Sequence, residues 1–349
     1  MNSRNITFLV VGLILGIALG SLALRALNPS SPDNPSSQSL AAAKPAGGGT
    51  QEAIYGPSLE SIRAATARVE SWIAANRVHP TRAGVAGFRN YALEVRSWYV
   101  LYAFERDPAK KERYAGKVRE AIGRLRQGEE LVAVLESTPA RKYIADLLIV
   151  MQAAREVGSK VPALEKVLPE LIERGLDAPN RPVGLQIPLA WLIRTVGSDQ
   201  GPGVNDLRAR GMLAAARSEV GMVELEVYIL THEIFGLSDY GLRRERFTTS
   251  EQAYLDRTLP FWTLFSAVMH DPDLGAELAI CHQVAGMTDE YAYGQSMGFL
   301  VASQSPEGFF QKQKPAAQAV DHMHTSFVGL HALLGHESLA AGYPLPLDR

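Results

Sequence analysis

A histidine-containing segment occurs twice in the C-terminal third of the chain. Residues 231–239 (THEIFGLSD) align without a gap with residues 281–289 (CHQVAGMTD), and a weaker third copy spans residues 331–335. His232 and His282 are therefore 50 residues apart, and His331 follows 49 residues later. Imidazole titrates near neutral pH and is a common metal ligand, so it serves as a general acid, a general base or a metal donor. The repeat marks these histidines as candidates for chemistry.

Helical geometry predicts that the repeated histidines approach one another. Adjacent packed helices lie about 8–10 Å apart, so histidines at equal heights on neighbouring helices would meet at a common centre. We predict His232 and His282 as acid–base residues, and we expect Glu233, Cys281, His324 and His331 to line the same pocket. The alternative is purely structural: each histidine packs in a helix interface and is satisfied by one carbonyl, with the glycine four residues later allowing close contact.

Asp239 and Asp289 each follow their histidine by seven residues. On a continuous helix that spacing is about 10.5 Å along the axis, too far for a direct contact within one copy. We interpret Ser238-Asp239 and Thr288-Asp289 as caps of the next segments, since such side chains satisfy free backbone N–H groups. In the alternative, both carboxylates face a central cavity and act as a catalytic acid and base, as in an inverting hydrolase.

The elements that must position these residues are predicted to be paired helices. A repeat period of about 20–50 residues is typical of stacked supersecondary units. Helix starts are indicated at Ser58, Asp107-Pro108 and Thr138-Pro139, and sustained period-two alternation is absent. Stops are indicated at Gly158, Gly175, Gly197 and Gly236. We predict an all-α domain of about six αα-hairpins, arranged as a toroid or a short solenoid.

Two further segments carry a resemblance to a known superfamily. Residues 304–310 (QSPEGFF) resemble the Gln-x-x-Asp-Gly-x-Trp turn of cyclases, with Glu307 in place of the Asp and Phe310 in place of the Trp. Residues 324–330 resemble the helix that follows such a turn. The chain thus resembles the broad α/α-toroid superfamily, which includes terpenoid cyclases, lanthionine cyclases and six-hairpin glycosidases. The resemblance implies a fold, and a fold alone does not determine chemistry.

The catalytic groups of these relatives are incomplete in the chain. Cys281-His282 is similar to the zinc-binding Cys-His pair of lanthionine cyclases, but Cys281 is the only cysteine, so a second thiolate is missing. Zinc would then need donors such as His232, His324 and Glu233, and we expect no cofactor. The acid pair of terpenoid cyclases is also missing, and its nearest match, Asp271-Pro272-Asp273-Leu274, is interpreted as a helix start.

The N-terminal part of the chain predicts a membrane anchor and a tether. Residues 6–24 form an uncharged run between Arg4 and Arg25, long enough to span a bilayer. We divide the chain into an anchor at 1–27, a Ser/Pro/Gly/Ala-rich flexible linker at 28–56 and the helical domain at 57–349. This organisation predicts a single-pass inner-membrane protein with a periplasmic domain. Gly12, Gly16 and Gly20 form a stripe on the anchor helix that would allow it to dimerise.

Composition limits the function without identifying it. A net charge of −2 gives no electrostatic argument for nucleic acid as a partner. The sequence contains no phosphate-cradling glycine loop, nucleophile elbow or dinucleotide fingerprint. We predict a binding or scaffolding module for a protein or glycan ligand. The alternative is a hydrolase or lyase that acts on an envelope glycan or peptide through a histidine-lined pocket.

Overall fold

The computed structural model describes residues 56–81, 84–126, 128–176, 181–311 and 322–348. Residues 49–349 form one compact unit by their contacts, and all helices of the described ranges lie within it. Those ranges contain helices and no strand apart from a single bridge between Gln304 and Phe310. The predicted all-α class is therefore confirmed for the described part of the chain.

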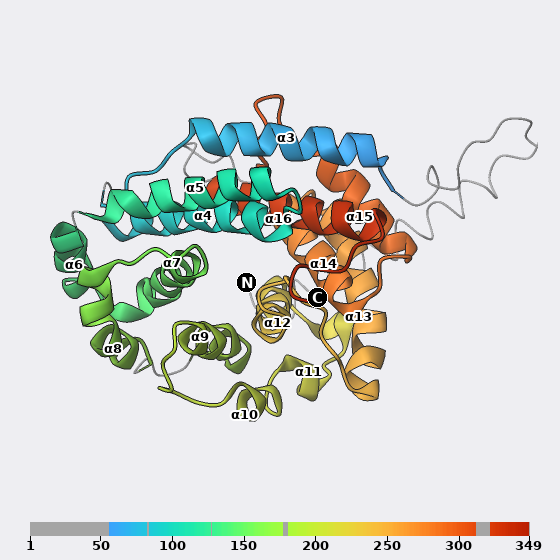
Figure 1. Ribbon diagram of the computed structural model, residues 1–349. Coiled ribbons are helices and arrows are strands. Elements are labelled where there is room, and N and C mark those ends of the chain that lie inside the picture. The colour runs from blue at the N-terminus through green and yellow to red at the C-terminus, as the bar shows by residue number, and fades with distance from the viewer. Residues whose placement is uncertain (1–55, 82–83, 127, 177–180, 312–321, 349) are drawn as a thin grey trace, which may run out of the picture. The chain divides into compact units, whose positions relative to one another are not determined.

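The helices keep the labels of Figure 1. They are, in order, α3 (Leu59–Ala75), α4 (Gly84–Phe104), α5 (Pro108–Gly123), α6 (Gly128–Glu136), α7 (Ile144–Glu156), α8 (Pro162–Leu176), α9 (Val183–Thr195), α10 (Val204–Arg208), α11 (Met212–Ala215), α12 (Glu224–Leu237), α13 (Thr249–Val268), α14 (Pro272–Ala285), α15 (Tyr291–Ala302) and α16 (Met323–Ala340). Short 3-10 helices occur at Arg124–Arg126, Ala140–Lys142 and Glu219–Gly221.

Six helices contact one another in a closed order. The contacts run from α4 to α7, α9, α12, α14 and α16, and α16 returns to α4. Helices of this inner set are buried on most sides: in α14 every residue from Pro272 to Val284 is buried. A helix that is apolar around most of its circumference belongs in an interior rather than at a surface. Figure 1 shows α7, α9 and α12 side by side, with α4 and α16 running together under α3.

The remaining helices pack on the outside of this set. α5 contacts α4, α10 contacts α9, α13 contacts α14, and α15 contacts α13 and α14. The first helix, α3, packs on the last, α16. The turn at residues 304–310 joins them, because Gln304 Nε2 donates to the carbonyl of Ala65 on α3 and the Phe310 N–H donates to Ser326 Oγ on α16.

Local sequence signals explain many of the helix ends. Ser58 and Asp107 cap α3 and α5 with their side chains, as predicted. Gly158 and Gly197 follow α7 and α9 with positive φ, which glycine adopts without strain. Thr138 is a correction: its hydroxyl donates to the Val134 carbonyl at the end of α6, and α7 begins only at Ile144.

Two of the predicted glycine stops lie one residue before the end of a helix, because α8 ends at Leu176 and α12 ends at Leu237. At Gly175 a side chain would collide with Ile144, and at Gly236 a Cβ would come within 2.5 Å of the Pro188 backbone nitrogen on α9. Both stops are thus predicted to within one residue, and both glycines also allow close helix contact.

The predicted anchor and linker fall mostly outside the described residues. Residues 6–24 and residues 28–55 belong to the part of the chain that the structure leaves undescribed. None of the helices in the described ranges combines the length and the apolar character that a bilayer crossing requires.

Candidate functional site

A cavity of about 590 Å³ opens where the N-terminal parts of several inner helices come together. Its walls combine carboxylates, imidazoles, one arginine and aliphatic side chains. The lining residues are Ala86, Arg89 and Asn90 of α4, Leu185 of α9, Leu225, Tyr228, Ile229 and His232 of α12, Asp273 and Glu277 of α14, and His324 and Thr325 of α16. We call this cavity the mouth pocket.

Local structure explains why two carboxylates of α14 enter the mouth pocket together. The Asp271 side chain caps α14 by accepting from the N–H groups of Asp273 and Leu274, and Pro272 occupies the first turn. Asp273 and Glu277 then lie four residues apart, so their side chains emerge on one face of the helix. The cap therefore fixes where this acidic face begins.

Glu277 is the most buried charged group of the mouth pocket. Its side chain is 0% exposed, and its Oε2 accepts a hydrogen bond from the Thr231 hydroxyl on α12. The Nδ1 atom of His232 lies 3.6 Å from Oε2, and the Nε2 atom of His324 lies 4.0 Å from Oε1. Oε1 has no hydrogen-bond partner among the described residues. Glu277 is thus held between two imidazoles with one oxygen unsatisfied.

His324 is oriented by Asp273. Its Nδ1 lies 2.7 Å from Asp273 Oδ1, which also accepts from the Thr325 hydroxyl. The Tyr228 hydroxyl donates to Asp273 Oδ2 at 3.1 Å. Because an imidazole donates through only one nitrogen when neutral, a proton on Nδ1 leaves a lone pair on Nε2. Asp273 therefore turns the lone pair of His324 towards Glu277.

His232 is oriented in a similar way by its own helix. Its Nδ1 lies 2.7 Å from the carbonyl oxygen of Tyr228, one turn earlier on α12. A carbonyl only accepts, so this contact places the proton on Nδ1 and the lone pair on Nε2. The side chain of His232 is 31% exposed. The mouth pocket thus contains a second oriented imidazole, which is partly exposed to solvent.

Electrostatics couple the groups of the mouth pocket. Burial raises the pKa of the Glu277 carboxyl, and Asp273 adds to the rise, whereas the two imidazoles oppose it. Burial lowers the pKa of His324, but the carboxylates of Asp273 and Glu277 outweigh it, so the net pKa is raised. On α7, burial raises the pKa of Asp146 to about 6, and Arg89 and His324 lower it. The carboxyls of Glu277 and Asp146 therefore hold a proton to higher pH than exposed carboxyls do.

The structure separates the repeated histidines that the sequence predicts to meet. His232 and His324 both lie in the mouth pocket, but His282 is completely buried near α13, where its Nε2 lies 3.1 Å from Thr263 Oγ1. His331 is buried between Phe104 and Phe327. α12 and α14 do contact each other, but they present their histidines in different directions. The expectation of one shared histidine layer is therefore wrong.

Glu233 and Cys281 also lie outside the mouth pocket. The Glu233 carboxylate accepts from the N–H groups of Met212 and Leu213 at the start of α11, and burial raises its pKa to about 7. Cys281 is fully buried on α14, and burial raises the pKa of its thiol well above the usual value. The zinc donors predicted around Cys281 and His282 do not come together.

Asp239 and Asp289 have different surroundings from each other. Asp239, at φ 53°, accepts from the indole N–H of Trp191 and pairs with Arg243 at 2.7 Å. Asp289 is exposed in the loop before α15. Neither residue caps the helix that follows: Thr248 caps α13, and α15 begins after Glu290 without a side-chain cap bond. Neither lines the mouth pocket, which corrects the interpretation as a catalytic pair. The cap interpretation holds only for Ser238, whose hydroxyl accepts from the Gly241 N–H.

Sequence reasoning missed the two carboxylates that matter most here. Asp273 was assigned to a helix start together with Asp271, and only Asp271 caps the helix. Glu277 is not among the predicted site residues because it lies outside the histidine repeat. One signal was available: Asp273, Glu277 and Cys281 recur every four residues on a segment otherwise rich in apolar residues. A charged stripe on a buried helix needs a polar partner.

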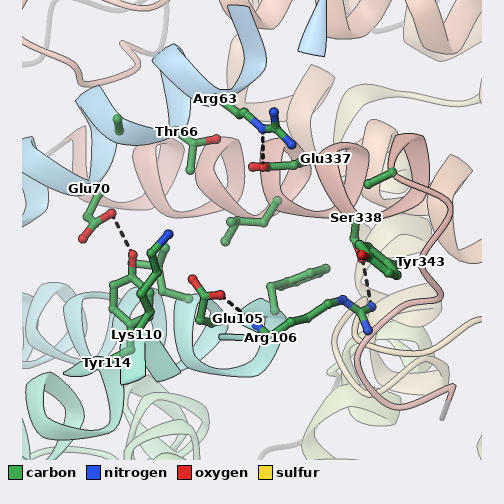
Figure 2. Close-up of a pocket in the computed structure, with 15 residues that line it drawn as sticks. Arg63, Thr66, Glu70, Glu105, Arg106, Lys110, Tyr114, Glu337, Ser338 and Tyr343 are labelled. Carbon is green, nitrogen blue, oxygen red and sulfur yellow. Dashed lines mark hydrogen bonds and ion pairs between the residues drawn. The ribbon is translucent and has the colours of Figure 1, made fainter. Parts of the chain in front are cut away.

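A second cavity of about 530 Å³ lies between α3, the α4–α5 junction and the end of α16. Figure 2 shows that several of its polar groups are already paired, with Arg63 bonded to Glu337 and the Tyr114 hydroxyl donating to Glu70. Arg106 donates to the Pro344 carbonyl and lies 4.1 Å from the Tyr343 ring centre. This cavity presents fewer unsatisfied groups than the mouth pocket.

Fold and site define an all-α domain with a polar cavity between its inner helices. A protein-family model described as "Domain of unknown function (DUF6895)" matches residues 98–328, which is more than half of the chain. The chain belongs to this family, and the match includes the mouth-pocket residues of α9, α12, α14 and α16, whereas those of α4 precede it. No curated protein matches the chain.

Proposed function

We propose that the domain is an enzyme of hydrolase or lyase type whose active site is the mouth pocket. The observation that carries the proposal is Glu277, a fully buried carboxylate that lies between two oriented imidazoles in a cavity open to solvent. Converging polar groups with one unsatisfied member are costly for stability, and catalytic sites are where proteins commonly retain them.

His232 is the proposed proton-transfer residue. Its lone pair on Nε2 would accept a proton from a water molecule while the water oxygen bonds to the electrophilic carbon of the substrate. The scissile C–O or C–N bond then breaks, and His232 returns its proton to the leaving atom, so the hydrolytic step balances. Burial of Glu277 and the contacts of Asp273 keep the surrounding groups in place.

The lining of the mouth pocket fits a polar substrate. Arg89 and Asn90 offer donors, the carboxylates offer acceptors, and Leu225 and Ile229 add apolar contact. This mixture suits sugar hydroxyls or peptide groups better than a lipid chain. We propose an envelope glycan or peptide as the substrate class.

The architecture and location are proposed on separate grounds. The return of contacts from α16 to α4 supports a closed toroid rather than an open solenoid. The run at 6–24 supports a single-pass inner-membrane anchor that holds the domain in the periplasm, with dimerisation through the glycine stripe. The scaffolding function keeps one support, namely the absence of an established catalytic motif in the sequence.

The test is an activity assay on the full chain. Purified peptidoglycan, which contains both glycan and peptide bonds, is incubated with the protein in water enriched in heavy oxygen, and released fragments are analysed by mass spectrometry. We expect fragment release by the wild type, its loss in Glu277→Gln, and its retention in Glu233→Gln, a matched change of an equally buried carboxylate outside the pocket. Heavy oxygen in the product indicates a hydrolase, and its absence indicates a lyase.

The contrary outcomes are equally clear. No fragment release by the wild type, with peptidoglycan retained on the protein, contradicts the enzyme and supports a binding module. Equal release by Glu277→Gln and the wild type contradicts the assignment of the active site.

A further inference from the structure

We infer that Glu277 and His324, with Asp273 orienting the imidazole, form a binding site for a divalent transition-metal ion such as Zn²⁺. This inference builds on the proposed function because it supplies the mouth pocket with a cofactor. The three side chains offer ligand atoms that all lie within 4.8 Å of one another. Carboxylate oxygen and imidazole nitrogen are donors that Zn²⁺, Fe²⁺ and Mn²⁺ accept.

The unsatisfied oxygen of Glu277 is the second, independent observation. Glu277 Oε1 is buried and without a hydrogen-bond partner in the described part of the chain, and His324 Nε2 lies 4.0 Å from it. When His324 is neutral and donates its Nδ1 proton to Asp273, its Nε2 presents a lone pair to this oxygen. A cation between the two atoms would satisfy both. Two metal–ligand bonds of about 2.0–2.2 Å place their donors about 3–4 Å apart, which matches this gap.

The outer contacts are those that metal ligands require. A ligating histidine commonly donates its other N–H to a carboxylate or carbonyl, which fixes the ring and raises its basicity. Asp273 does this for His324, and the Thr231 hydroxyl holds the second oxygen of Glu277. His232, fixed by the Tyr228 carbonyl, borders the same carboxylate.

Charge balance points the same way. Among the described residues, the basic side chains within 4.0 Å of the Glu277 carboxylate are the imidazoles of His232 and His324, and neither an arginine nor a lysine. A buried carboxylate without a permanent cation is unfavourable. A divalent ion would neutralise Glu277, and the solvent-facing side of the cavity leaves coordination positions for water and substrate, as in catalytic sites.

Metal titration of the full, untagged chain tests the inference. After treatment with a chelator, Zn²⁺ binding is measured by calorimetry, and Co²⁺ is added in parallel because its visible absorption reports its coordination. We expect one ion per chain. Asp273→Asn should weaken Zn²⁺ about 10–100-fold, the range typical for loss of a partner that orients a ligand. Glu277→Gln and His324→Gln should weaken it more, and Glu233→Gln should leave it unchanged.

The outcomes separate this inference from the proposed function. A Zn²⁺ stoichiometry near zero, or equal affinity in the wild type and Glu277→Gln, overturns the metal site. Circular dichroism shows whether each variant is folded. Because Glu277→Gln and His324→Gln remove different ligands, one of them still tests the inference if the other does not fold. Peptidoglycan cleavage that persists in chelator overturns the metal alone. Metal binding at this cluster without cleavage overturns the enzyme alone.

Discussion

His324 and His331 lie two turns apart on the same helix, yet their surroundings make them different chemical groups. His324 is 28% exposed and faces the carboxylates of Asp273 and Glu277, which raise its pKa. His331 is buried beside the rings of Phe104 and Phe327, and burial lowers its pKa to about 3. His324 is therefore available to bind a proton or a metal ion, whereas His331 stays neutral near pH 7.

His232 on α12 and His282 on α14 differ in the same way. His232 is partly exposed in the mouth pocket, while burial lowers the pKa of His282 to about 4. One histidine of each pair therefore belongs to a site and the other to the core. The comparison shows that sequence equivalence within a repeat does not give chemical equivalence, because burial and the facing charges decide what an imidazole does.

The largest expected effect concerns the buried histidine of α16. A folded-state pKa of about 3, below the ordinary 6.5, means that His331 contributes stability above pH 6.5 and loses it as the pH falls. The total loss is roughly 5 kcal/mol, at about 1.4 kcal/mol for each pH unit below 6.5. Urea unfolding between pH 7 and pH 5 measures it. As the pH falls below 6.5, the unfolding free energy of the wild type relative to that of His331→Leu should decrease by about 1.4 kcal/mol for each pH unit.

The control for this prediction is His324→Leu, the same substitution in the mouth pocket. His324 has a raised pKa, so its contribution should be present at low pH and be lost as the pH rises through its folded pKa. The two variants should therefore change the pH dependence in opposite directions. Parallel pH profiles for both variants contradict the comparison.

Glu233 provides a test with the opposite sign within the core. Its pKa of about 7 exceeds the ordinary 4.5, so the folded state prefers the protonated carboxyl. Stability should fall as the pH rises from about 4.5 through 7, by roughly 3 kcal/mol in total. Glu233→Gln should remove this dependence, because an amide does not ionise in that range. An unchanged pH slope in the variant contradicts the prediction, and chemical unfolding at several pH values measures it.

The fold was predictable to the extent that local signals determine it. Ser58, Asp107 and Pro108 mark helix starts because a capping side chain acts on backbone groups a few residues away. Gly236 marks the end of α12 to within one residue, but no local pattern reveals that α9 packs against this glycine. The helical class thus follows from the sequence, and the packing partner of each glycine does not.

The site was predictable only in part, for a related reason. His232 and His324 were both named from the sequence, and both reach the mouth pocket. His282 was predicted as an acid–base residue equivalent to His232, because the alignment of the repeat contains no information on how each helix is rotated about its axis. Glu277 was not predicted because a single buried glutamate is recognisable as a site residue only from its contacts. Those contacts come from Thr231, His232 and His324 on other helices.

Replacement of Glu277 should show how far its buried carboxylate lowers the free energy of unfolding. In the chelated protein at pH 8, Glu277→Gln should raise the free energy of unfolding by about 1–3 kcal/mol, because it removes a buried charge that lacks a permanent partner. The gain should reverse when Zn²⁺ is added, since only the wild type then gains stability from binding. Thermal unfolding with and without Zn²⁺ measures both effects. A loss of stability in the chelated variant shows that Glu277 is a structural residue.

The smallest effect on stability is expected at His232. Its side chain is partly exposed and its hydrogen-bond contacts are with Tyr228 and Thr231 of its own helix, so His232→Gln should change the free energy of unfolding by about 0.5 kcal/mol or less. The same change should reduce peptidoglycan cleavage by about 100-fold or more, as expected when a general base is lost. His282→Gln should do the reverse, with a large loss of stability and unchanged turnover per folded molecule. Equal effects of the two substitutions on both measurements would show that the pocket and the core do not differ as proposed.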